Sequence, residues 1–382
     1  AHGNLGFSLL DQGKLSEAIE SLKRALEISP DYADAFANLV RAKQEICDWS
    51  SWEEDQARLG QLVQEQLVDN TVVSYGSTSA LGLLPLPAIQ PLYSLASTLS
   101  LLEVQQLAKR YAAKAKMNTA LVETHYRWQP RSRSSRIKVG YVSSDFGNHP
   151  VSHLMQSVFG MHDRSRFEVF CYATSSGDGS HWRRAIETET ENFKDVSQLH
   201  SGDVAQLIQN DGIHILINLN GYTKGATNEV FALRPCLVQV SFLGFSGTTG
   251  ADYIDYLVAD RTVIPEESRQ YYTEQMIYMP HTCYVNDHKQ SARFVLDRTL
   301  SPPPQRQQYG ISEDKFVFCS FTRVYKIDPL IFRTWMSILK RVPNSILWLL
   351  RFPGIAEDNL REEAKLQGVR DDQLHFTDVV PK

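Results

Sequence analysis

Apolar residues along the chain follow two different periods, and the change between them divides the sequence. In the first 48 residues the apolar positions form the stripe of amphipathic helices, and residues 49–128 look helical but irregular, with prolines breaking the middle. From residue 136 onward, short β-branched runs alternate with helix-like stretches. They predict strands at 137–142, 167–172, 213–219 and 238–242, helices at 152–161, 182–189 and 203–210, and a shorter strand within 252–259. This alternation predicts an α/β domain with a parallel sheet and helices on both faces.

A second alternation of strands and helices begins after a polar link at about 287–309. The predicted strands are 316–321, 346–351 and 374–376, and the predicted helices are 329–342 and 357–367. This pattern is the first half of a second Rossmann-like domain. Two such domains facing one another imply a ligand-binding cleft between them.

The first 48 residues contain an internal repeat. Asn4 and Leu5 recur as Asn38 and Leu39, an offset of 34 residues, which is the period of tetratricopeptide helical hairpins. Gly6 falls where that repeat needs a small packing residue. Arrays of such hairpins form concave surfaces for extended peptides, so we expect protein or peptide partners along this surface. An isolated helical hairpin is the alternative.

These patterns divide the chain into four regions. They are tetratricopeptide repeats at 1–48, a helical transition region at 49–128, a first Rossmann-like lobe at 136–290 and the start of a second lobe at 310–382. Residues 129–136, Q-P-R-S-R-S-S-R, have the composition of a linker. The chain begins inside a repeat and ends directly after a predicted strand. We therefore expect a piece of a longer protein, truncated at both ends, whose second lobe is incomplete.

The composition excludes several classes of protein. The net charge of −5 gives no basic footprint for nucleic acid. No stretch approaches the ~18 apolar residues of a membrane span, and no signal peptide opens the chain, so neither membrane insertion nor secretion is expected. The 5 cysteines are scattered and form no CxxC pair, as in reduced proteins of the cytosol or nucleus.

The stretch from Tyr141 to His153 passes from a predicted strand through a polar loop into a predicted helix. Pro150 suits the first helical turn, which places His149 at a helix N-terminus beyond a strand's carboxyl end, where open α/β sheets bind ligands. We interpret His149 as a polar or acid–base group at the cleft; a capping or core histidine is the alternative. No Glu follows His149 and no third ligand is evident, so a metal site with His153 is disfavoured, and His153 is interpreted as structural.

Two further strand ends lead into polar loops. N-G-Y-T-K-G at 220–225 offers amides, an Asn side chain and a lysine to a sugar or phosphate, unless it is simply a Gly-rich turn. G-F-S-G-T-T-G at 244–250 offers backbone amides that can cradle an oxyanion, but it lacks the spacing of a P-loop. From these loops we take as candidates for sugar or acceptor contact Asn220, Tyr222, Thr223, Gly247 and Thr248.

Lys326 follows the first strand of the second lobe and precedes a helix that begins near Pro329. A lysine at that place can meet a phosphate near the helix N-terminus; a solvated surface lysine is the alternative. The sequence contains no D-x-D triplet, the usual carboxylate clamp for a metal-bound nucleotide sugar. A site without metal must neutralise a departing diphosphate with Lys, Arg, amides and helix ends.

Together with the repeats, these residues resemble the O-linked N-acetylglucosamine transferase family of nuclear and cytoplasmic proteins. The resemblance covers nearly the whole chain. Its motifs are V-G-Y-V-S-S-D-F-G-N-H-P at 139–150, F-E-V-F-C-Y-A at 167–173, N-G-Y-T-K-G at 220–225, F-A-L-R-P at 231–235, Y-M-P-H-T at 278–282, Y-K-I-D-P at 325–329 and R-V-P-N-S-I-L-W-L-L-R-F at 341–352.

The resemblance implies a B-type glycosyltransferase with two facing Rossmann-like lobes, preceded by an all-α tetratricopeptide segment. It implies transfer of N-acetylglucosamine from UDP-GlcNAc to Ser or Thr hydroxyls of intracellular proteins, with inversion and without a metal or other cofactor. By the same resemblance, His149 matches the family's active-site histidine and Lys326 its diphosphate-binding lysine. The implied partners are the nucleotide sugar and protein acceptors, and the implied location is the nucleus and cytoplasm.

The chain departs from the family pattern at three positions. Ser246 stands where the family usually has Pro, Thr227 where it has Arg, and Arg323 at a donor-site position where it has Gln, although Arg could itself bind phosphate. The family's remaining nucleotide-binding residues lie beyond Lys382. Three alternatives stay open: a protein O-fucosyltransferase of the Spindly branch with a GDP donor, a catalytically inactive tetratricopeptide scaffold, and a phosphate-binding metabolic enzyme, against which the repeats argue.

Overall fold

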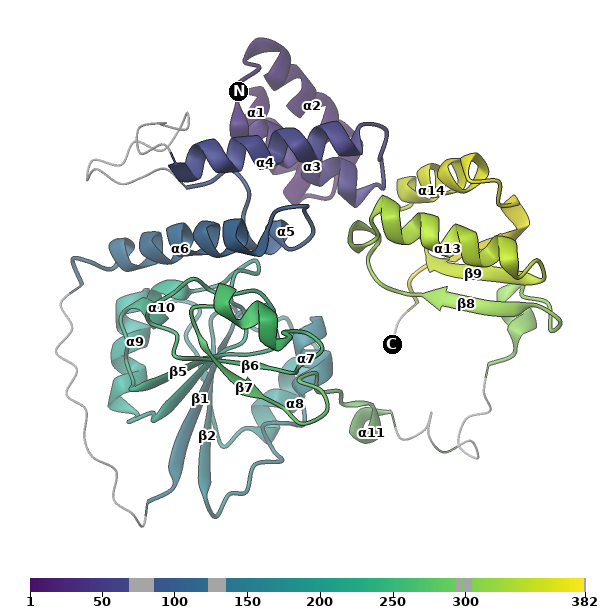
Figure 1. Cartoon of the computed structure of the whole chain (residues 1–382). Helices are drawn as coiled ribbons and strands as arrows, with labels where there is room; N and C mark the ends of the chain where they lie inside the picture. Colours follow the sequence, from purple (N-terminus) through teal and green to yellow (C-terminus); the bar gives the residue numbers. More distant parts are fainter. Residues whose placement is uncertain (69–85, 123–134, 293–296, 298–303, 381–382) are drawn as a thin grey trace. The chain divides into compact units, whose positions relative to one another are not determined.

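The computed structural model describes residues 1–68, 86–122, 135–292, 297 and 304–380 (Figure 1). It divides into two compact units. The first comprises residues 1–89, 96–98 and 302–382, and the second comprises residues 90–95 and 99–301. The expected linker at 129–136 lies outside the described residues except for its last two, and the expected polar link at 287–309 is described only in part.

The first unit begins with four helices: α1 (His2–Asp11), α2 (Leu15–Ile28), α3 (Ala33–Glu45) and α4 (Trp52–Val68). The apolar faces of α1, α2 and α3 close a core that includes Leu9, Ala18, Leu22 and Leu39. A Cβ atom added to Gly6 would lie 2.6 Å from Cγ of Leu22, so α1 and α2 approach too closely for a larger residue at position 6. The close packing of α1 against α2 therefore explains why the repeat requires a small residue at position 6.

The same unit contains a three-stranded parallel sheet in the order β10-β9-β8. Its strands and helices are β8 (Phe316–Ser320), η3 (Val324–Lys326), α13 (Pro329–Arg341), β9 (Ser345–Leu350), α14 (Ile355–Leu366) and β10 (Leu374–Thr377), with the short 3-10 helices η2 (Arg306–Tyr309) and η4 (Asp371–Gln373). The three strands and two α-helices predicted for this region are confirmed to within two residues at each end.

The end of the tetratricopeptide segment and this sheet share one hydrophobic core. Cys47 is buried in the same cluster as Phe332 on α13, and the ring of Trp49 lies 5.4 Å from the Phe332 ring. The Asn359 side-chain amide on α14 donates a hydrogen bond to the Ile46 carbonyl (2.8 Å). Residues from the two ends of the sequence thus complete a single packed unit.

The second unit is built on a parallel sheet whose described strands follow the order β3-β2-β1-β4-β5-β6-β7. They are β1 (Ile137–Ser143), β2 (Phe167–Ala173), β3 (Asn192–Asp195), β4 (Ile215–Asn218), β5 (Val238–Ser241), β6 (Tyr256–Ala259) and β7 (Gln275–Tyr278). The five strands predicted for this region are all present, β4 and β6 being shorter than predicted. The two edge strands, β3 and β7, were not predicted.

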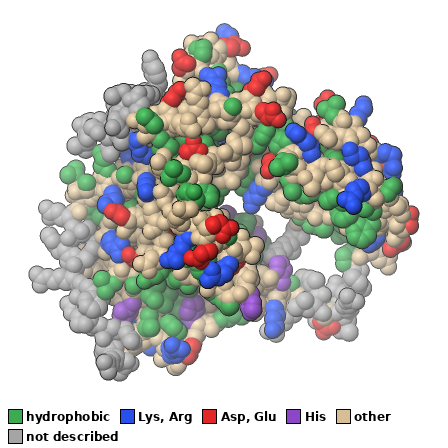
Figure 2. All heavy atoms as spheres, in the orientation of Figure 1, with side chains coloured by type: hydrophobic (Ala, Val, Ile, Leu, Met, Phe, Trp, Pro, Cys, Tyr) green, Lys and Arg blue, Asp and Glu red, His purple; other side chains and the backbone are tan. Residues whose placement is uncertain are grey.

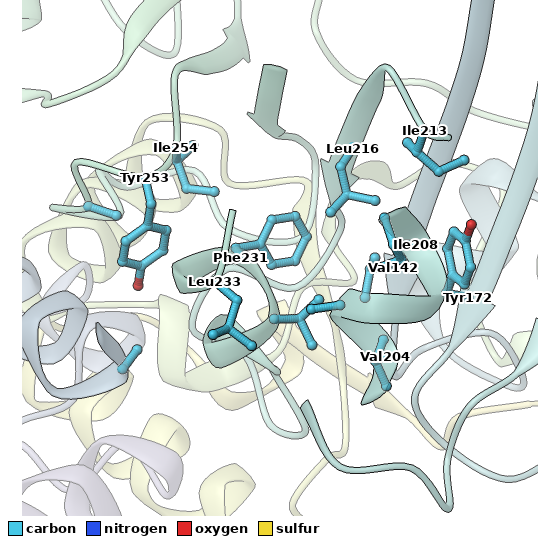
Figure 3. Close-up of a cluster of buried hydrophobic side chains, with 14 of the residues drawn as sticks. Val142, Tyr172, Val204, Ile208, Ile213, Leu216, Phe231, Leu233, Tyr253 and Ile254 are labelled. Atoms are coloured by element: carbon cyan, nitrogen blue, oxygen red, sulfur yellow. The ribbon is translucent and has the colours of Figure 1, made fainter. Parts of the chain in front are cut away.

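Helices cover both faces of this sheet, as predicted. Helices α7 (Pro150–Met155) and α8 (His181–Glu189) pack on one face, and α6 (Leu101–Asn118), α9 (Ser201–Asn210) and α10 (Asn228–Ala232) pack on the other. The unit also contains the short helices α5 (Pro91–Ser94), η1 (Glu266–Tyr271) and α11 (His288–Ser291). The helix predicted at 152–161 begins two residues earlier and ends at Met155. Neighbouring residues of β1 point to opposite faces: Tyr141 packs in a core with Met155 of α7, whereas Val142 packs in a core with Ile208 of α9 and Phe231 of α10 (Figure 3).

The boundary between the two units falls inside the region at 49–128 that the sequence predicted as a helical transition. Helix α4 belongs to the first unit and α6 to the second. Ala112 and Ala115 of α6 are buried with Phe231 in the core of the second unit, and their small side chains let α6 pack closely. A capping box formed by Ser100 and Glu103 fixes the start of α6.

In the part of the chain that the structure describes, no helix has both the length and the apolar character needed to cross a membrane. On the face drawn in Figure 2, acidic and basic side chains are interspersed. All five cysteines are free thiols.

Candidate active site

The order of the larger sheet defines where a ligand is expected. From β1 the chain continues to β2 and β3 on one side, whereas β4 leads to β5, β6 and β7 on the other. The neighbouring strands β1 and β4 therefore form the topological switch point, and open α/β sheets bind ligands beyond the carboxyl ends of such a pair. The loops at 144–149 and 219–225 leave these two ends, so they form the candidate site.

The loop after β1 turns tightly and carries His149 to the start of α7. Its amides bond within the loop: Gly147 N donates to the Asp145 carbonyl (3.0 Å), and His149 N donates to the Gly147 carbonyl (2.8 Å). His149 is the N-cap of α7, where its Nδ1 accepts from Val151 N (3.3 Å), and Pro150 begins the helix. The predicted helix N-terminus is thus confirmed, and 43% of the His149 side chain is exposed.

Asn220 ties the loop after β4 to the loop after β1. Its Oδ1 accepts from Ser144 N (2.9 Å), and its Nδ2 lies within hydrogen-bond distance of Ser144 Oγ (2.9 Å), Asp145 Oδ2 (2.8 Å) and Thr223 Oγ1 (3.0 Å). Asn218 Oδ1 in turn accepts from the amide of Asn220 (2.9 Å). Asn220 is 3% exposed, so its role in this structure is to hold the two loops in register.

Asp145 is the buried acid of the site. One of its oxygens, Oδ2, lies 3.5 Å from Nδ1 of His149, and 9% of its side chain is exposed. Burial raises the pKa of Asp145, while the nearby His149 and the hydrogen bonds from Ser144 and Asn220 oppose that rise. The sequence analysis gave Asp145 no role, although Asp145 lies within the motif at 139–150, because the spacing of residues in a non-helical loop does not show which side chains meet.

A second layer of residues from the β2–α8 segment supports the loop. The carboxylate of Asp178 accepts from Asn148 N (2.6 Å), and the buried guanidinium of Arg183 donates to the Phe146 carbonyl (3.2 Å). Burial tends to raise the pKa of Asp178, but the hydrogen bonds from Asn148 and Ser180 outweigh it and lower this pKa to about 2. These contacts join residues about thirty positions apart, and no sequence motif signals them.

His153 contacts neighbouring side chains, and its structural role stays a prediction. Its ring lies 4.2 Å from the Trp182 ring, and its Nε2 is 3.0 Å from Oδ1 of Asn148. Among the residues that the structure describes, no three His, Cys, Asp or Glu side chains gather closely enough to hold a metal ion. The absence of a metal cofactor stays a prediction.

Residues 244–250 bind an anion that belongs to the protein itself. Thr249 N donates to Glu274 Oε1 (2.6 Å), Thr248 Oγ1 donates to Glu274 Oε2 (2.8 Å), and Gly250 N donates to Thr248 Oγ1 (3.1 Å). The expectation that these amides cradle a ligand oxyanion is therefore wrong for Thr249 and Gly250. Thr248 and Gly247 are buried, and whether they contact substrate stays a prediction.

Tyr222 and Thr223 lie beside a pocket of about 230 Å³ between their loop and α6, which Tyr111 and Lys114 also line. The Tyr222 hydroxyl donates to the Thr249 carbonyl (2.6 Å), and burial raises the pKa of Tyr222 well above its ordinary value. Tyr222 is thus bonded to the protein, while Thr223 is partly exposed at the pocket.

Lys326 and Arg323 lie in the first unit, at the turn between β8 and α13. Both side chains are exposed. Lys326 ends η3, and its Nζ lies 5.8 Å from the centre of the Tyr325 ring. The Arg323 guanidinium lies 4.9 Å from the Phe352 ring centre, and its charge, with that of Arg41, opposes the burial that raises the pKa of Glu45 on α3. The roles of Lys326 and Arg323 in donor binding, and the pairing of Lys326 with His149, stay predictions.

Comparison with known proteins matches both parts of the chain to families. The model for glycosyl transferase family 41 matches residues 46–305 and 302–382, and a model for the TPR repeat matches residues 6–41. A solved structure of a Thermobaculum terrenum O-GlcNAc transferase mutant matches this chain over 100% of the chain's length and 61% of the length of the solved chain. The TM-score is 0.65 and the sequence identity is 24%. That likeness shows a tetratricopeptide segment followed by a glycosyltransferase fold.

Two relatives are more similar in sequence. An *Arabidopsis thaliana* protein described as probable UDP-N-acetylglucosamine–peptide N-acetylglucosaminyltransferase SEC is 49% identical over 78% of this chain and 31% of its own length. A *Caenorhabditis elegans* UDP-N-acetylglucosamine–peptide N-acetylglucosaminyltransferase is 33% identical over 89% of this chain and 38% of its own. The chain thus spans about a third of the length of these relatives. It belongs to glycosyl transferase family 41.

Proposed function

We propose that the protein containing this chain transfers N-acetylglucosamine from UDP-GlcNAc to Ser or Thr hydroxyls of other proteins, with inversion and without a metal cofactor. The observation that carries the proposal is the 49% identity to the *A. thaliana* relative, whose name states this donor and a peptide acceptor. The site described above supports it, because His149 lies partly exposed at the switch point of the larger sheet.

The proposed chemistry has two tasks, which we assign to different residues. Attack by a hydroxyl on the anomeric carbon needs a group that takes a proton, and we assign that role to His149. The departing diphosphate gains charge, and Lys326, together with Arg323, would neutralise it. Both basic side chains are exposed, as a contact with a ligand requires.

We also propose that acceptor proteins bind along the tetratricopeptide surface and that the protein works in the nucleus and cytoplasm. The repeat supports the first proposal, since such arrays bind extended peptides. The five free cysteines support the second, because reducing compartments keep thiols unpaired.

The test is a donor comparison with the full-length protein. It is incubated with a Ser/Thr-containing acceptor peptide and either UDP-GlcNAc or GDP-fucose, and the modified peptide is measured by mass spectrometry, with and without EDTA. We expect transfer of N-acetylglucosamine that EDTA does not reduce. Transfer of fucose alone would contradict the proposal, and so would a protein that neither transfers sugar nor gains thermal stability from UDP.

A further inference from the structure

One ring nitrogen of His149 lies near two groups, an amide that can only donate a hydrogen bond to it and a carboxylate that can only accept one from it. Nδ1 accepts a hydrogen bond from the Val151 amide (3.3 Å), and it also lies 3.5 Å from Oδ2 of Asp145. A neutral imidazole has one N–H donor and one acceptor nitrogen. If Nδ1 accepts from Val151, the proton is on Nε2. If Nδ1 carries the proton, it can donate to Asp145, and Nε2 keeps a lone pair.

Only the second tautomer can take a proton through Nε2. In the first, His149 is a capping residue whose outer nitrogen already carries hydrogen. In the second, the lone pair of Nε2 is free to accept the hydrogen of a bound hydroxyl. The group that decides between the tautomers therefore decides whether His149 can act as a base.

Hydrogen bonds hold the Asp145 carboxylate beside the His149 ring. Its Oδ2 accepts from Asn220 Nδ2 (2.8 Å), its Oδ1 accepts from Ser144 Oγ (3.0 Å), and its carbonyl accepts from Ser152 Oγ (2.5 Å). A carboxylate bonded at both oxygens and at its own backbone cannot turn away from the ring. Catalytic hydrogen bonds are often long before substrate binds, so a separation of 3.5 Å is within range of a contact that shortens.

We propose that Asp145 is a positioning residue that selects the tautomer of His149 with hydrogen on Nδ1, leaving Nε2 to accept the proton of the acceptor hydroxyl. The inference rests on the proposed function and assigns a new role within it. In the step, the acceptor oxygen bonds to the anomeric carbon while the bond from that carbon to the diphosphate oxygen breaks. UDP leaves with that electron pair, and the hydroxyl proton moves to Nε2.

Three other ionisable side chains have contacts with protein groups other than the His149 ring. Asp178 binds the Asn148 amide, and His153 contacts the Asn148 side chain. The guanidinium of Arg183 donates to Asp195 (2.8 Å) as well as to the loop carbonyl. Among the described residues, Asp145 is the acidic side chain that pairs with the His149 ring.

The first experiment needs no enzymatic activity. The 382-residue chain is labelled with ¹⁵N in its 11 histidines, and two-bond ¹H–¹⁵N spectra at pH 8 report which ring nitrogen carries hydrogen; His149→Asn assigns the signal. We expect hydrogen on Nδ1 in the wild type and on Nε2 in Asp145→Asn. A wild-type spectrum with hydrogen on Nε2 would overturn the proposal, whether or not the variant folds.

The second experiment measures the pH profile of kcat/KM in the full-length protein. Loss of the Asp145 carboxylate destabilises the imidazolium, so in Asp145→Asn we expect the acid limb to move to lower pH and kcat/KM to fall ~10- to 100-fold, less than in a buried triad because His149 is partly exposed. Asp178→Asn loosens the same loop without touching the ring, so it should lower the rate without moving that limb.

The two experiments separate two kinds of failure. If both variants move the acid limb equally, Asp145 acts only through the shape of the loop and the proposal is wrong. If the wild-type protein transfers no N-acetylglucosamine, the proposed function fails, while the spectra still decide which tautomer Asp145 selects.

Discussion

Two loops in this chain leave the first strand of a parallel sheet and enter a helix at a proline, yet they cap that helix differently. After β8, Asp328 precedes Pro329 and its Oδ1 accepts from Ile331 N at 2.7 Å. After β1, His149 precedes Pro150 and its Nδ1 lies 3.3 Å from Val151 N, so that it can cap the helix only when Nδ1 carries no hydrogen. Aspartate is among the preferred N-caps and histidine is not.

The difference indicates what each position is for. The residue at 328 is the one that helix capping favours, and its hydrogen bond is short. At 149, capping gives no reason for an imidazole, since Asp, Asn or Ser would cap α7 better. The β1–α7 loop also buries a carboxylate beside its cap, whereas the basic residues of the β8–α13 loop are exposed. Position 149 therefore has the features of a residue placed for chemistry.

The largest expected effect comes from His149→Asn. Asn caps helices well, so the chain should unfold at the same urea concentration or a higher one. Sugar transfer by the full-length protein should nevertheless fall ~10²- to 10⁴-fold, the usual contribution of a general base. Initial rates and urea unfolding together check this. If stability and rate fall in parallel, the role of His149 is to cap the helix, and the two loops do not differ in function.

Lys326→Ala is expected to have the next largest effect. Loss of a fixed cation at the leaving diphosphate should lower kcat ~10²- to 10³-fold, as loss of other groups that stabilise developing charge does. Lys340→Ala is the matched control, because Lys340 lies near the other end of α13 and donates to the Gln367 carbonyl (3.0 Å). Equal losses in both variants would mean that the position of the charge on this lobe is unimportant.

Asp328→Ala tests the second loop as a structural cap. The loss of the side-chain acceptor should cost about 1 kcal/mol, so that amides in the first turn of α13 exchange hydrogen roughly five times faster. Asp328→Asn retains an acceptor and should change exchange little. Hydrogen exchange resolved by peptide measures both. Unchanged exchange in Asp328→Ala would show that packing alone fixes the start of this helix.

The smallest effect concerns acid stability of the first loop. The pKa of Asp178 is lowered to about 2 from an ordinary value of 3.8. Its ionised form therefore stabilises the fold above about pH 4, and that contribution is lost as the pH falls toward 2. Melting temperatures from pH 5 to 2 should show the wild type losing more than Asp178→Asn. Parallel curves would mean that the bond to Asn148 adds no stability.

The sequence predicted the central strands and most of the longer helices, because each is an apolar run or an amphipathic stretch, but it placed the end of α7 at 161 instead of 155. It missed β3 and β7, which are four residues long and lie at the edges of the sheet. Edge strands are only partly buried, so the apolar pattern that marks a strand is weak there. It also could not show that Ala112 and Ala115 bring α6 into the core of the second unit, since an alanine face does not name its partner.

For the candidate site at the end of β1, the motifs contained His149 and Asn220 but did not show which residues hold the loop after β1. The roles of Asp178 and Arg183 depend on contacts between the β2–α8 segment and a loop about thirty residues earlier. Such contacts form only when the chain folds in three dimensions, so the local pattern of apolar residues cannot predict them. The same holds for Glu274, whose carboxylate accepts from the Thr249 amide and the Thr248 hydroxyl of the 244–250 loop.

The core shared by Cys47, Trp49 and Phe332 has a consequence for synthesis of the protein. Cys47 bonds to the Val324 carbonyl, 277 positions later, and the whole second unit lies between them in the sequence. At ~5–20 residues per second, a ribosome needs tens of seconds to cover that interval. The larger sheet can therefore finish folding while Cys47 and Trp49 still lack the partners that bury them in the complete protein.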